Sequence, residues 1–427
     1  MKLLAAIMLV LPAVAFAEPI QPLIDAAEPG STLTIGPGTY EGPAVIEKPL
    51  HLITNSGATI RGNGSGKVVW IHANHVTVEG FRVRHSGIDL QKDDAAIFVQ
   101  GDFAIIRGNQ IEDSLHGIYV KKAADCQLIE NRIVGKKSID ADPKTPLEFK
   151  PEGAENCDAT LTQSRRGNGI HLWNSQRITV RNNVITDARD GIYFSFTHHS
   201  QVVGNRVTHV RFGLHYMYSD YNYFERNVFA ENSAGAAIMY SKGLLIRNNT
   251  FAANVGHRAY GLVMMSVDTS TLEENQILGN SVGLFLELSN NNTFLGNRIA
   301  NGYIGARMTG SSDGNKFSRN IFAGNLHPVE IDGSLGANEW AIDGVGNQWS
   351  TAEVDLNGDG VGDLPHRETD LLGSLRRPFP LIALLSGSPG LGLLRFAQQH
   401  AEIPHVPAVV DPAPLGVSFS ATKAFTH

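Results

Sequence analysis

The side chains best suited to specific chemistry in this sequence are three methionines and a histidine at regular spacing. Met217, Met239 and Met265 are 22 and 26 residues apart, and His215 precedes the first of them by two residues. Thioethers and imidazole are soft or borderline ligands that favour Cu(I) and release it readily. If the fold aligns these positions, the sequence predicts a copper site. The spacing alone also fits an adaptable protein-docking surface or a chance alignment.

An internal repeat supplies such an alignment. An Asn followed two positions later by an apolar residue recurs at spacings of 22, 52, 22, 22, 22, 26, 22 and 23 residues. These residues are Asn109, Asn131, Asn183, Asn205, Asn227, Asn249, Asn275, Asn297 and Asn320. A unit of about 22 residues with short alternating strands and no room for a helix is typical of one coil of a parallel β-helix. Leucine-rich repeats and propeller blades have other patterns or longer periods.

We therefore expect an all-β fold, a right-handed parallel β-helix of about 22-residue coils. The recurring Asn would form an internal ladder from coil to coil, whereas four others are interpreted as turn residues: Asn248, Asn290, Asn291 and Asn292.

The domain boundaries follow from where the repeat begins and ends. Residues 1–17 are predicted to be a signal peptide that directs export, because an apolar stretch precedes the cleavage motif Ala15-Phe16-Ala17. Residues 18–350 form the β-helix, with an N-terminal cap helix near 21–27 and an inserted loop at about 139–168. Residues 351–374 are an Asp/Gly-rich region. Residues 375–427 form an extended C-terminal tail, which we expect either to contact a partner or to cover the last coil.

Alternation within the strands assigns each side chain to the core or to the outer surface. By this rule Met264 and Met308 are core residues, whereas Met217, Met239 and Met265 share one outward column beside His215. Five further outward residues are predicted to form a docking surface around them: His171, Trp173, Tyr193, Phe285 and Glu287.

A carbohydrate-binding or carbohydrate-cleaving protein is the competing class, because many β-helix proteins act on polysaccharides with this face. Such chemistry needs paired carboxylates, or carboxylates with Ca²⁺ and a basic residue. The central columns offer Glu287 as their one carboxylate, and spacing does not pair Asp187, Asp190 or Asp220. We therefore expect a protein that is not an enzyme.

A second candidate metal site lies beyond the repeat. Asp355, Asn357, Asp359 and Asp363 place oxygen ligands at alternate positions around a Gly turn, as in loops that wrap Ca²⁺. The position of the twelfth-residue Glu of an EF-hand is His366, so calcium and a metal-free acidic turn both remain open.

The two cysteines and the net charge bear on compartment and partners. In an oxidising compartment Cys126 and Cys157 are expected to form a disulfide that holds the inserted loop; two reduced metal ligands are the alternative. The formal charge of −7 argues against a nucleic-acid partner, which would require a basic surface.

The combination of features resembles the NosD family of periplasmic maturation proteins of nitrous oxide reductase. The resemblance rests on Ala26-Ala27-Glu28-Pro29-Gly30 and Gly38-Thr39-Tyr40, the Asn/Gly coils, the 355–363 loop and the Arg377-Pro378-Phe379-Pro380-Leu381 tail. It implies a periplasmic location and partnership with the membrane subunit and ATPase of an ABC transporter, a lipoprotein copper chaperone and nitrous oxide reductase. Because no short copper motif defines the family, the ligand set rests on the methionine column.

Overall fold

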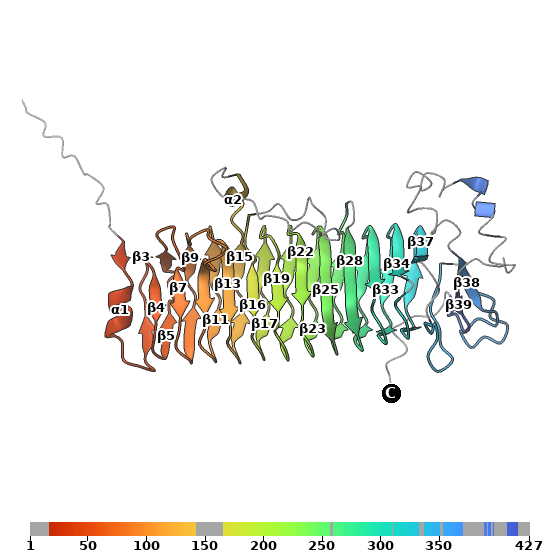
Figure 1. Cartoon of the computed structure of the whole chain (residues 1–427), viewed down its shortest axis with the longest axis horizontal. Coiled ribbons are helices and arrows are strands. Elements are labelled where there is room, and N and C mark those ends of the chain that lie inside the picture. The colour runs from red at the N-terminus through yellow and green to blue at the C-terminus, as the bar shows by residue number, and fades with distance from the viewer. Residues whose placement is uncertain are drawn as a thin grey trace, which may run out of the picture.

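In a computed structural model, the chain winds into an elongated stack of coils with α1 at one end and β38 and β39 at the other (Figure 1). The structure describes residues 17–141, 165–256, 259–309, 311–332, 337–350, 353–369, 388–390, 392–393, 396 and 408–416. The predicted signal peptide therefore falls almost wholly outside the described residues. Among these residues, no helix has the length and apolar character needed to cross a membrane.

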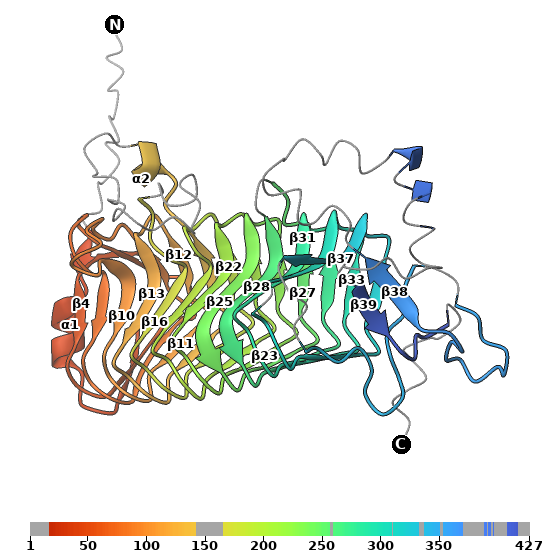
Figure 2. The same cartoon turned by 45° about the vertical axis from the view of Figure 1, so that its right-hand side comes forward.

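Three parallel sheets run the length of the stack, and each coil contributes one strand to each sheet (Figure 2). The 13-stranded sheet consists of β1 (Glu18–Pro19), β3 (Thr39–Glu41), β6 (Thr59–Arg61), β9 (Arg82–Arg84), β12 (Gln110–Glu112), β15 (Arg132–Val134), β18 (Val184–Thr186), β21 (Arg206–Thr208), β24 (Val228–Ala230), β27 (Thr250–Ala252), β30 (Gln276–Leu278), β33 (Arg298–Ala300) and β36 (Ile321–Ala323). The predicted parallel β-helix is confirmed.

The two other sheets have 12 strands each. One contains β2 (Thr32–Thr34), β5 (Leu50–Ile53), β8 (Val76–Glu79), β11 (Ile105–Arg107), β14 (Gln127–Ile129), β17 (Thr179–Arg181), β20 (Gln201–Val203), β23 (Tyr223–Glu225), β26 (Leu245–Arg247), β29 (Thr271–Glu273), β32 (Thr293–Leu295) and β35 (Lys316–Ser318). The other, which we call the face sheet, contains β4 (Ala44–Ile46), β7 (Val69–Ile71), β10 (Ala95–Val99), β13 (His116–Lys121), β16 (Ile170–Trp173), β19 (Ile192–Ser195), β22 (Phe212–Met217), β25 (Ala234–Lys242), β28 (Tyr260–Asp268), β31 (Val282–Glu287), β34 (Ile304–Thr309) and β37 (His327–Asp332).

The recurring Asn form the predicted internal ladder. In a typical step, the Asn227 side-chain oxygen accepts hydrogen bonds from the backbone N–H (3.0 Å) and side-chain amide (2.9 Å) of Asn205. The Asn227 amide in turn donates to the Val202 carbonyl at 2.8 Å. Every polar group of this buried side chain is thereby satisfied, which is the condition for burying it without a net cost.

A second ladder corrects one sequence-based interpretation. Asn292 is fully buried and bonds Asn315, which bonds Asn338 in the next coil, so Asn292 is a ladder residue rather than a turn residue. The residues of the second ladder repeat every 22 or 23 residues, as those of the first ladder do. The sequence pattern alone therefore did not separate the two series.

Both ends of the stack are covered. The predicted cap helix is α1 (Gln21–Ala26), which buries Ile24 against the first coil. At the other end, β38 (His366–Thr369) and β39 (Ala408–Asp411) form an antiparallel pair. The carboxylate of Asp411 accepts hydrogen bonds from the Asn347 backbone N–H at 2.7 Å and from the Trp349 indole at 3.0 Å, so it terminates the Asn ladder. Part of the predicted tail, 408–416, therefore covers the last coil.

The inserted loop begins where the sequence predicted. Helix α2 (Ser138–Ala141) follows β15, and the rest of the loop from 142 to 164 lies outside the described residues. The chain rejoins the stack before β16, which pairs in register with β13. The 52-residue Asn spacing is thus one coil plus an excursion, and it leaves the face sheet continuous.

Candidate metal centre

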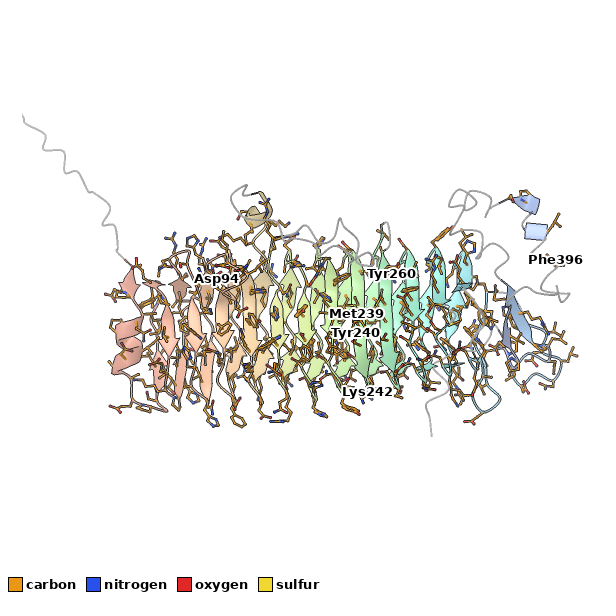
Figure 3. The ribbon with its side chains drawn as sticks, in the orientation of Figure 1. Asp94, Met239, Tyr240, Lys242, Tyr260 and Phe396 are labelled. Carbon is orange, nitrogen blue, oxygen red and sulfur yellow. The ribbon has the colours of Figure 1, made fainter. Side chains whose placement is uncertain are left out.

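The face sheet places the three methionines in one column. Register pairing joins Met217 of β22 to Met239 of β25, Met239 to Met265 of β28, and Met265 to Glu287 of β31. Adjacent parallel strands lie about 4.8 Å apart, so the three thioethers project from neighbouring positions. Figure 3 places Met239 and its neighbour Tyr240 midway along the stack. The predicted alignment of the three positions is confirmed.

The methionines divide between surface and core as alternation predicted. Met264 and Met308 belong to the interior apolar cluster, whereas Met217, Met239 and Met265 do not. Met217 and Met265 are partly exposed, and Met239 between them is 8% exposed. The central thioether is therefore shielded from solvent on the outer surface of the sheet.

His215 lies two residues before Met217 on the same strand and is held by a buried ionic network. Its Nδ1 is 2.9 Å from Oδ2 of Asp190, a residue that is 1% exposed. Arg211 contacts the same carboxylate with Nε at 2.8 Å and Nη2 at 2.6 Å. Burial alone would raise the pKa of Asp190, but the charges and hydrogen bonds of Arg211 and His215 outweigh it and hold that pKa well below its usual range.

The docking residues lie beyond the two ends of the methionine column and in the neighbouring column of His215. His171 and Tyr193 continue the column of His215 towards the N-terminal end, with ring centroids 4.4 Å apart, and Tyr193 is 4.9 Å from His215. Trp173 lies beside them, with Lys121 above its ring at 5.1 Å. On the C-terminal side, Phe285 and Glu287 belong to the same strand, β31. The ring centroid of Phe285 is 5.5 Å from that of Tyr260 in β28. The structure thus brings the predicted docking residues onto one face.

An exposed aromatic stack borders the methionine column. Phe196, Tyr218 and Tyr240 follow the strand positions Ser195, Met217 and Met239 by one residue, and they are 48%, 44% and 46% exposed. Their rings stack face to face at 5.1 and 5.0 Å, so the stack presents ring edges to solvent. The sequence analysis did not single out these residues, although they recur every 22 residues.

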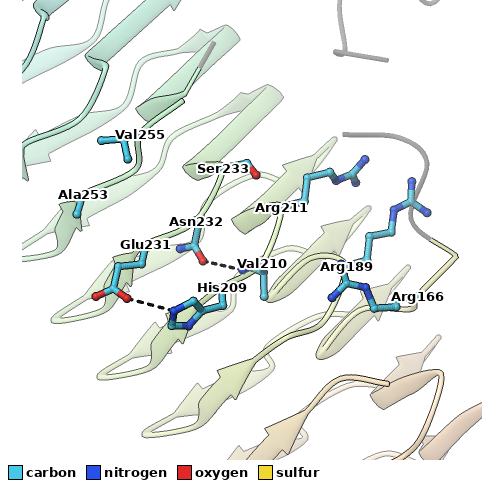
Figure 4. A pocket seen from close by; sticks show the side chains of 10 residues that line it. All are labelled: Arg166, Arg189, His209, Val210, Arg211, Glu231, Asn232, Ser233, Ala253 and Val255. Atoms are coloured by element: carbon cyan, nitrogen blue, oxygen red, sulfur yellow. Dashed lines mark hydrogen bonds and ion pairs between the residues drawn. The ribbon is translucent and has the colours of Figure 1, made fainter. Parts of the chain in front are cut away.

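A pocket of about 710 Å³ opens beside the strands that carry His215. Figure 4 shows the guanidinium groups of Arg166, Arg189 and Arg211 gathered on one side, and the His209–Glu231 ion pair (3.2 Å) on the other. None of the methionines lines this pocket. Arg211 connects it with the candidate centre through Asp190.

The predicted calcium loop is closed by its own hydrogen bonds. The two carboxylate oxygens of Asp355 accept from the backbone N–H groups of Gly358 and Gly360 at 2.7 and 2.9 Å, and Asp363 accepts from Leu356 at 2.5 Å. Within the described part of the chain, no three His, Cys, Asp or Glu side chains are grouped for one metal ion. Calcium at Asp355, Asn357, Asp359 and Asp363 stays a prediction.

Cys126 is a free, buried thiol in the interior cluster. It donates to the carbonyls of Ala124 and Gly101 at 3.3 and 3.4 Å, and burial raises the pKa of the thiol to about 11. Its predicted partner, Cys157, lies outside the described residues. The disulfide between Cys126 and Cys157 therefore stays a prediction.

Comparison with known proteins places the chain in a family. A family described as "Periplasmic copper-binding protein (NosD)" matches residues 153–354. A protein of Pseudomonas aeruginosa named "Probable ABC transporter binding protein NosD" is 36% identical over 96% of this chain and 94% of its own length. The chain belongs to the NosD family. A second NosD protein, from Stutzerimonas stutzeri, is 34% identical over 88% of this chain and 85% of its own length.

Solved structures share the fold of this NosD-family chain at much lower identity. The catalytic unit of an α-1,3-glucanase from Streptomyces thermodiastaticus superposes with a TM-score of 0.57 at 15% identity, covering 79% of this chain and 66% of that one. The A-module of a mannuronan C-5 epimerase from Azotobacter vinelandii gives 0.53 at 12% identity, covering 78% and 95%. At these identities the likeness concerns the parallel β-helix alone.

Sequence reasoning missed the residues that support His215 in this NosD-family chain. Asp190 was noted only as an unpaired turn residue, and Arg211 was not singled out. The pair is 21 residues apart, one short of a coil; Asp190 directly precedes Gly191, and Arg211 lies two residues before Gly213, the glycine 22 residues further on. The sequence signal for this ion pair was an acidic and a basic residue separated by almost one coil length.

Proposed function

We propose that this NosD-family protein is a non-enzymatic periplasmic assembly factor that receives copper, as Cu(I), at His215, Met217, Met239 and Met265. It passes the ion to nitrous oxide reductase during maturation. The observation that carries the proposal is the register of the three methionines on adjacent strands, next to a histidine. The family description as copper-binding and periplasmic supports it.

The ligand types suit transfer of Cu(I) rather than permanent storage. Thioethers are soft, neutral ligands that favour Cu(I), and flexible methionine side chains can adjust to the ion as it arrives and leaves. Met217 and Met265 are partly exposed at the two ends of the column, whereas Met239 is shielded at its centre. An ion bound near the centre would be held away from water yet remain reachable from both ends.

The partners follow from the relatives and from the flanking surface. Relatives are named ABC transporter binding proteins, which supports association with the membrane subunit and ATPase of such a transporter. A lipoprotein copper chaperone would deliver the ion, and the reductase would accept it. His171, Trp173 and Tyr193 on one side, and Phe285 and Glu287 on the other, offer partly exposed aromatic and polar contacts for these encounters.

Two features support a non-enzymatic role against polysaccharide cleavage. Glycoside cleavage needs a pair of available carboxyl groups. Asp190, beside His215, is bound on both oxygens by Arg211, and Glu287 lies next to Met265 without a second carboxylate assigned to it. The stacked rings of Phe196, Tyr218 and Tyr240 present edges, whereas sugar stacking uses ring faces.

The test is a Cu(I) titration against a competing chelator. A triple variant with Met217, Met239 and Met265 each changed to Leu keeps the side-chain volume but removes the thioethers, and we expect it to bind Cu(I) at least about 100-fold more weakly than the wild type. The matched control changes the interior Met264 and Met308 to Leu, and its affinity should equal that of the wild type.

Equal affinity of the wild type and the triple Leu variant would refute the ligand assignment. Turnover of a polyuronide or a glucan by the purified protein would instead favour the enzyme class. The absence of any Cu(I) binding, with transporter association intact, would reduce the protein to a scaffold.

A further inference from the structure

Three histidines, one of them buried and two partly buried, are carried by strands of the face sheet, and the Nδ1 atom of each meets a group whose hydrogen-bonding role is fixed. His116 and His171 belong to the neighbouring strands β13 and β16, and His215 belongs to β22. The rings of His116 and His171 are 5.1 Å apart, and Tyr193 separates His171 from His215. By residue type alone, all three are candidate copper ligands.

The environment of His215 determines which of its nitrogens carries hydrogen. Both oxygens of Asp190 receive N–H groups of Arg211 in a fork-shaped pair, which is the arrangement of an ionised carboxylate. An ionised carboxylate only accepts hydrogen bonds, so Nδ1 of His215, 2.9 Å from Oδ2, must be the donor. The longer approach of Arg211 to the same nitrogen, at 3.4 Å, is then a van der Waals and electrostatic contact. In neutral His215 the lone pair is on Nε2.

Asn168 imposes the opposite state on the two other histidines. Its backbone N–H donates to Nδ1 of His116 at 3.0 Å, and its side-chain amide nitrogen lies 3.2 Å from Nδ1 of His171. Both groups of Asn168 are donors, so Nδ1 of each histidine accepts and the hydrogen of each neutral ring is on Nε2. Burial keeps the rings neutral, because it lowers the pKa of His116 to about 4 and that of His171 well below its ordinary value.

We propose that Asp190 is a positioning residue that makes Nε2 of His215 the copper-binding atom, and that Asn168 keeps His116 and His171 as hydrogen-bond donors that do not bind the metal. The proposal rests on the copper function of the methionine column. Histidines that bind metals almost always donate their second ring N–H to a carboxylate, carbonyl or water, which fixes the ring orientation and makes the ligand more basic. Of the three histidines, His215 has this partner.

The arrangement also makes the support rigid. Asp190 is 1% exposed, it lies two residues before the start of β19, and its own carbonyl accepts a hydrogen bond from Gly169. Arg211 precedes β22, the strand that carries both His215 and Met217. The carboxylate therefore joins two adjacent coils and fixes the orientation of the imidazole.

The first test measures the imidazole nitrogens of the metal-free wild-type protein by ¹⁵N NMR, with assignment by single His→Gln variants. We expect the Nδ1–H form for His215 and the Nε2–H form for His116 and His171. This measurement needs no variant at Asp190, so it remains informative even if that variant folds poorly. An Nε2–H form at His215 would overturn the proposal.

The second test compares Cu(I) affinity in Asp190→Asn and Asp187→Asn. The first variant should bind about 10- to 100-fold more weakly and lose the Nδ1–H preference of His215, as for other supporting groups of metal ligands. Asp187, in the same turn, pairs with Lys137 at 2.7 Å and provides the control, with unchanged affinity. Asn168→Asp should convert His171 to the Nδ1–H form, because the new carboxylate can only accept.

The outcomes separate this proposal from the function on which it rests. If the wild type binds Cu(I) through the methionines and Asp190→Asn binds equally well, the positioning role is refuted while the copper function stands. If the wild type binds no Cu(I), the proposed function fails, and the assignment of Nε2 as a copper-binding atom fails with it.

Discussion

The inside and the outer face of the same coils follow different rules. Inside, Asn205, Asn227 and Asn249 make the same bonds in every coil, and large apolar side chains stack above one another. On the outer face, residue types change from one coil to the next: Ser195 is followed in its column by Met217, Met239, Met265 and then Glu287. A position that repeats along the whole stack serves the architecture, whereas a composition confined to a few coils indicates a local function.

This contrast makes separable predictions for stability and for metal binding. Interior changes should lower the free energy of unfolding and leave Cu(I) affinity unchanged in the protein that folds. Changes in the methionine column should weaken Cu(I) binding and have little effect on the free energy of unfolding.

The largest effect is expected at the centre of the Asn ladder. Asn227→Ala removes the acceptor for the Asn205 backbone and side-chain N–H groups, and the donor to the Val202 carbonyl, at a fully buried position. Unsatisfied buried groups cost about 1–3 kcal/mol each, so we expect about 4 kcal/mol less stability in urea unfolding. Thr250→Ala, an outward change on β27, is the control and should cost about 0.5 kcal/mol or less.

Neighbouring methionines provide the sharpest form of the comparison. Met264 is fully buried, whereas Met265, the next residue, is on the outer face. Met264→Ala leaves a cavity and should cost about 3 kcal/mol of unfolding free energy with unchanged Cu(I) affinity. Met265→Ala should cost under about 1 kcal/mol and weaken Cu(I) binding. If both variants lost stability to the same extent, the assignment of Met265 to the outer face would be wrong.

A third prediction concerns the C-terminal cap, which does not share the repeat. His366 stacks on Trp349 and bonds Glu353 at 2.9 Å and Glu368 at 3.2 Å. Burial alone would lower its pKa, but the two glutamates raise the pKa of His366 to about 9 from an ordinary 6.5. The stabilisation from protonated His366 is therefore complete below about pH 6.5 and is lost as the pH rises to about 9, by about 3 kcal/mol.

Hydrogen exchange of β38 and β39 at pH 6, 7.5 and 9 measures this effect. Protection of the wild type should fall across that interval, while His366→Gln should show little dependence on pH. A flat wild-type profile would mean that the two glutamates do not hold the proton.

The parts of the fold that sequence could predict are those that repeat. Spacing of the Asn residues gave the coil, and alternation then assigned Met264 to the core and Met217, Met239 and Met265 to one outward column. Both assignments need only the period and the strand geometry, which are the same in every coil.

The support of the candidate centre could not be predicted in the same way. Asp190 is in a turn, where alternation does not set the direction of a side chain, and its partners are 21 and 25 residues away rather than 22. Asn168 follows the inserted loop, and Asp411 reaches the Asn ladder from a distant segment. Such contacts depend on the path of individual turns, which no periodic pattern encodes.

The smallest effect on stability is expected for the exposed stack beside the methionine column. Tyr218 is in contact with Phe196 and Tyr240 at 5.1 and 5.0 Å but is 44% exposed. Tyr218→Ala removes two aromatic contacts of about 0.5–1 kcal/mol each, part of which solvent replaces, so we expect a loss of about 1 kcal/mol or less in urea unfolding. Cu(I) affinity should stay at the wild-type value, because the ring belongs to the turn and not to the methionine column. If the stacked rings instead shield the thioethers of Met217 and Met239 from solvent, Tyr218→Ala would accelerate Cu(I) release to a chelator in stopped-flow measurements. That result would extend the functional region from the column to the turn beside it.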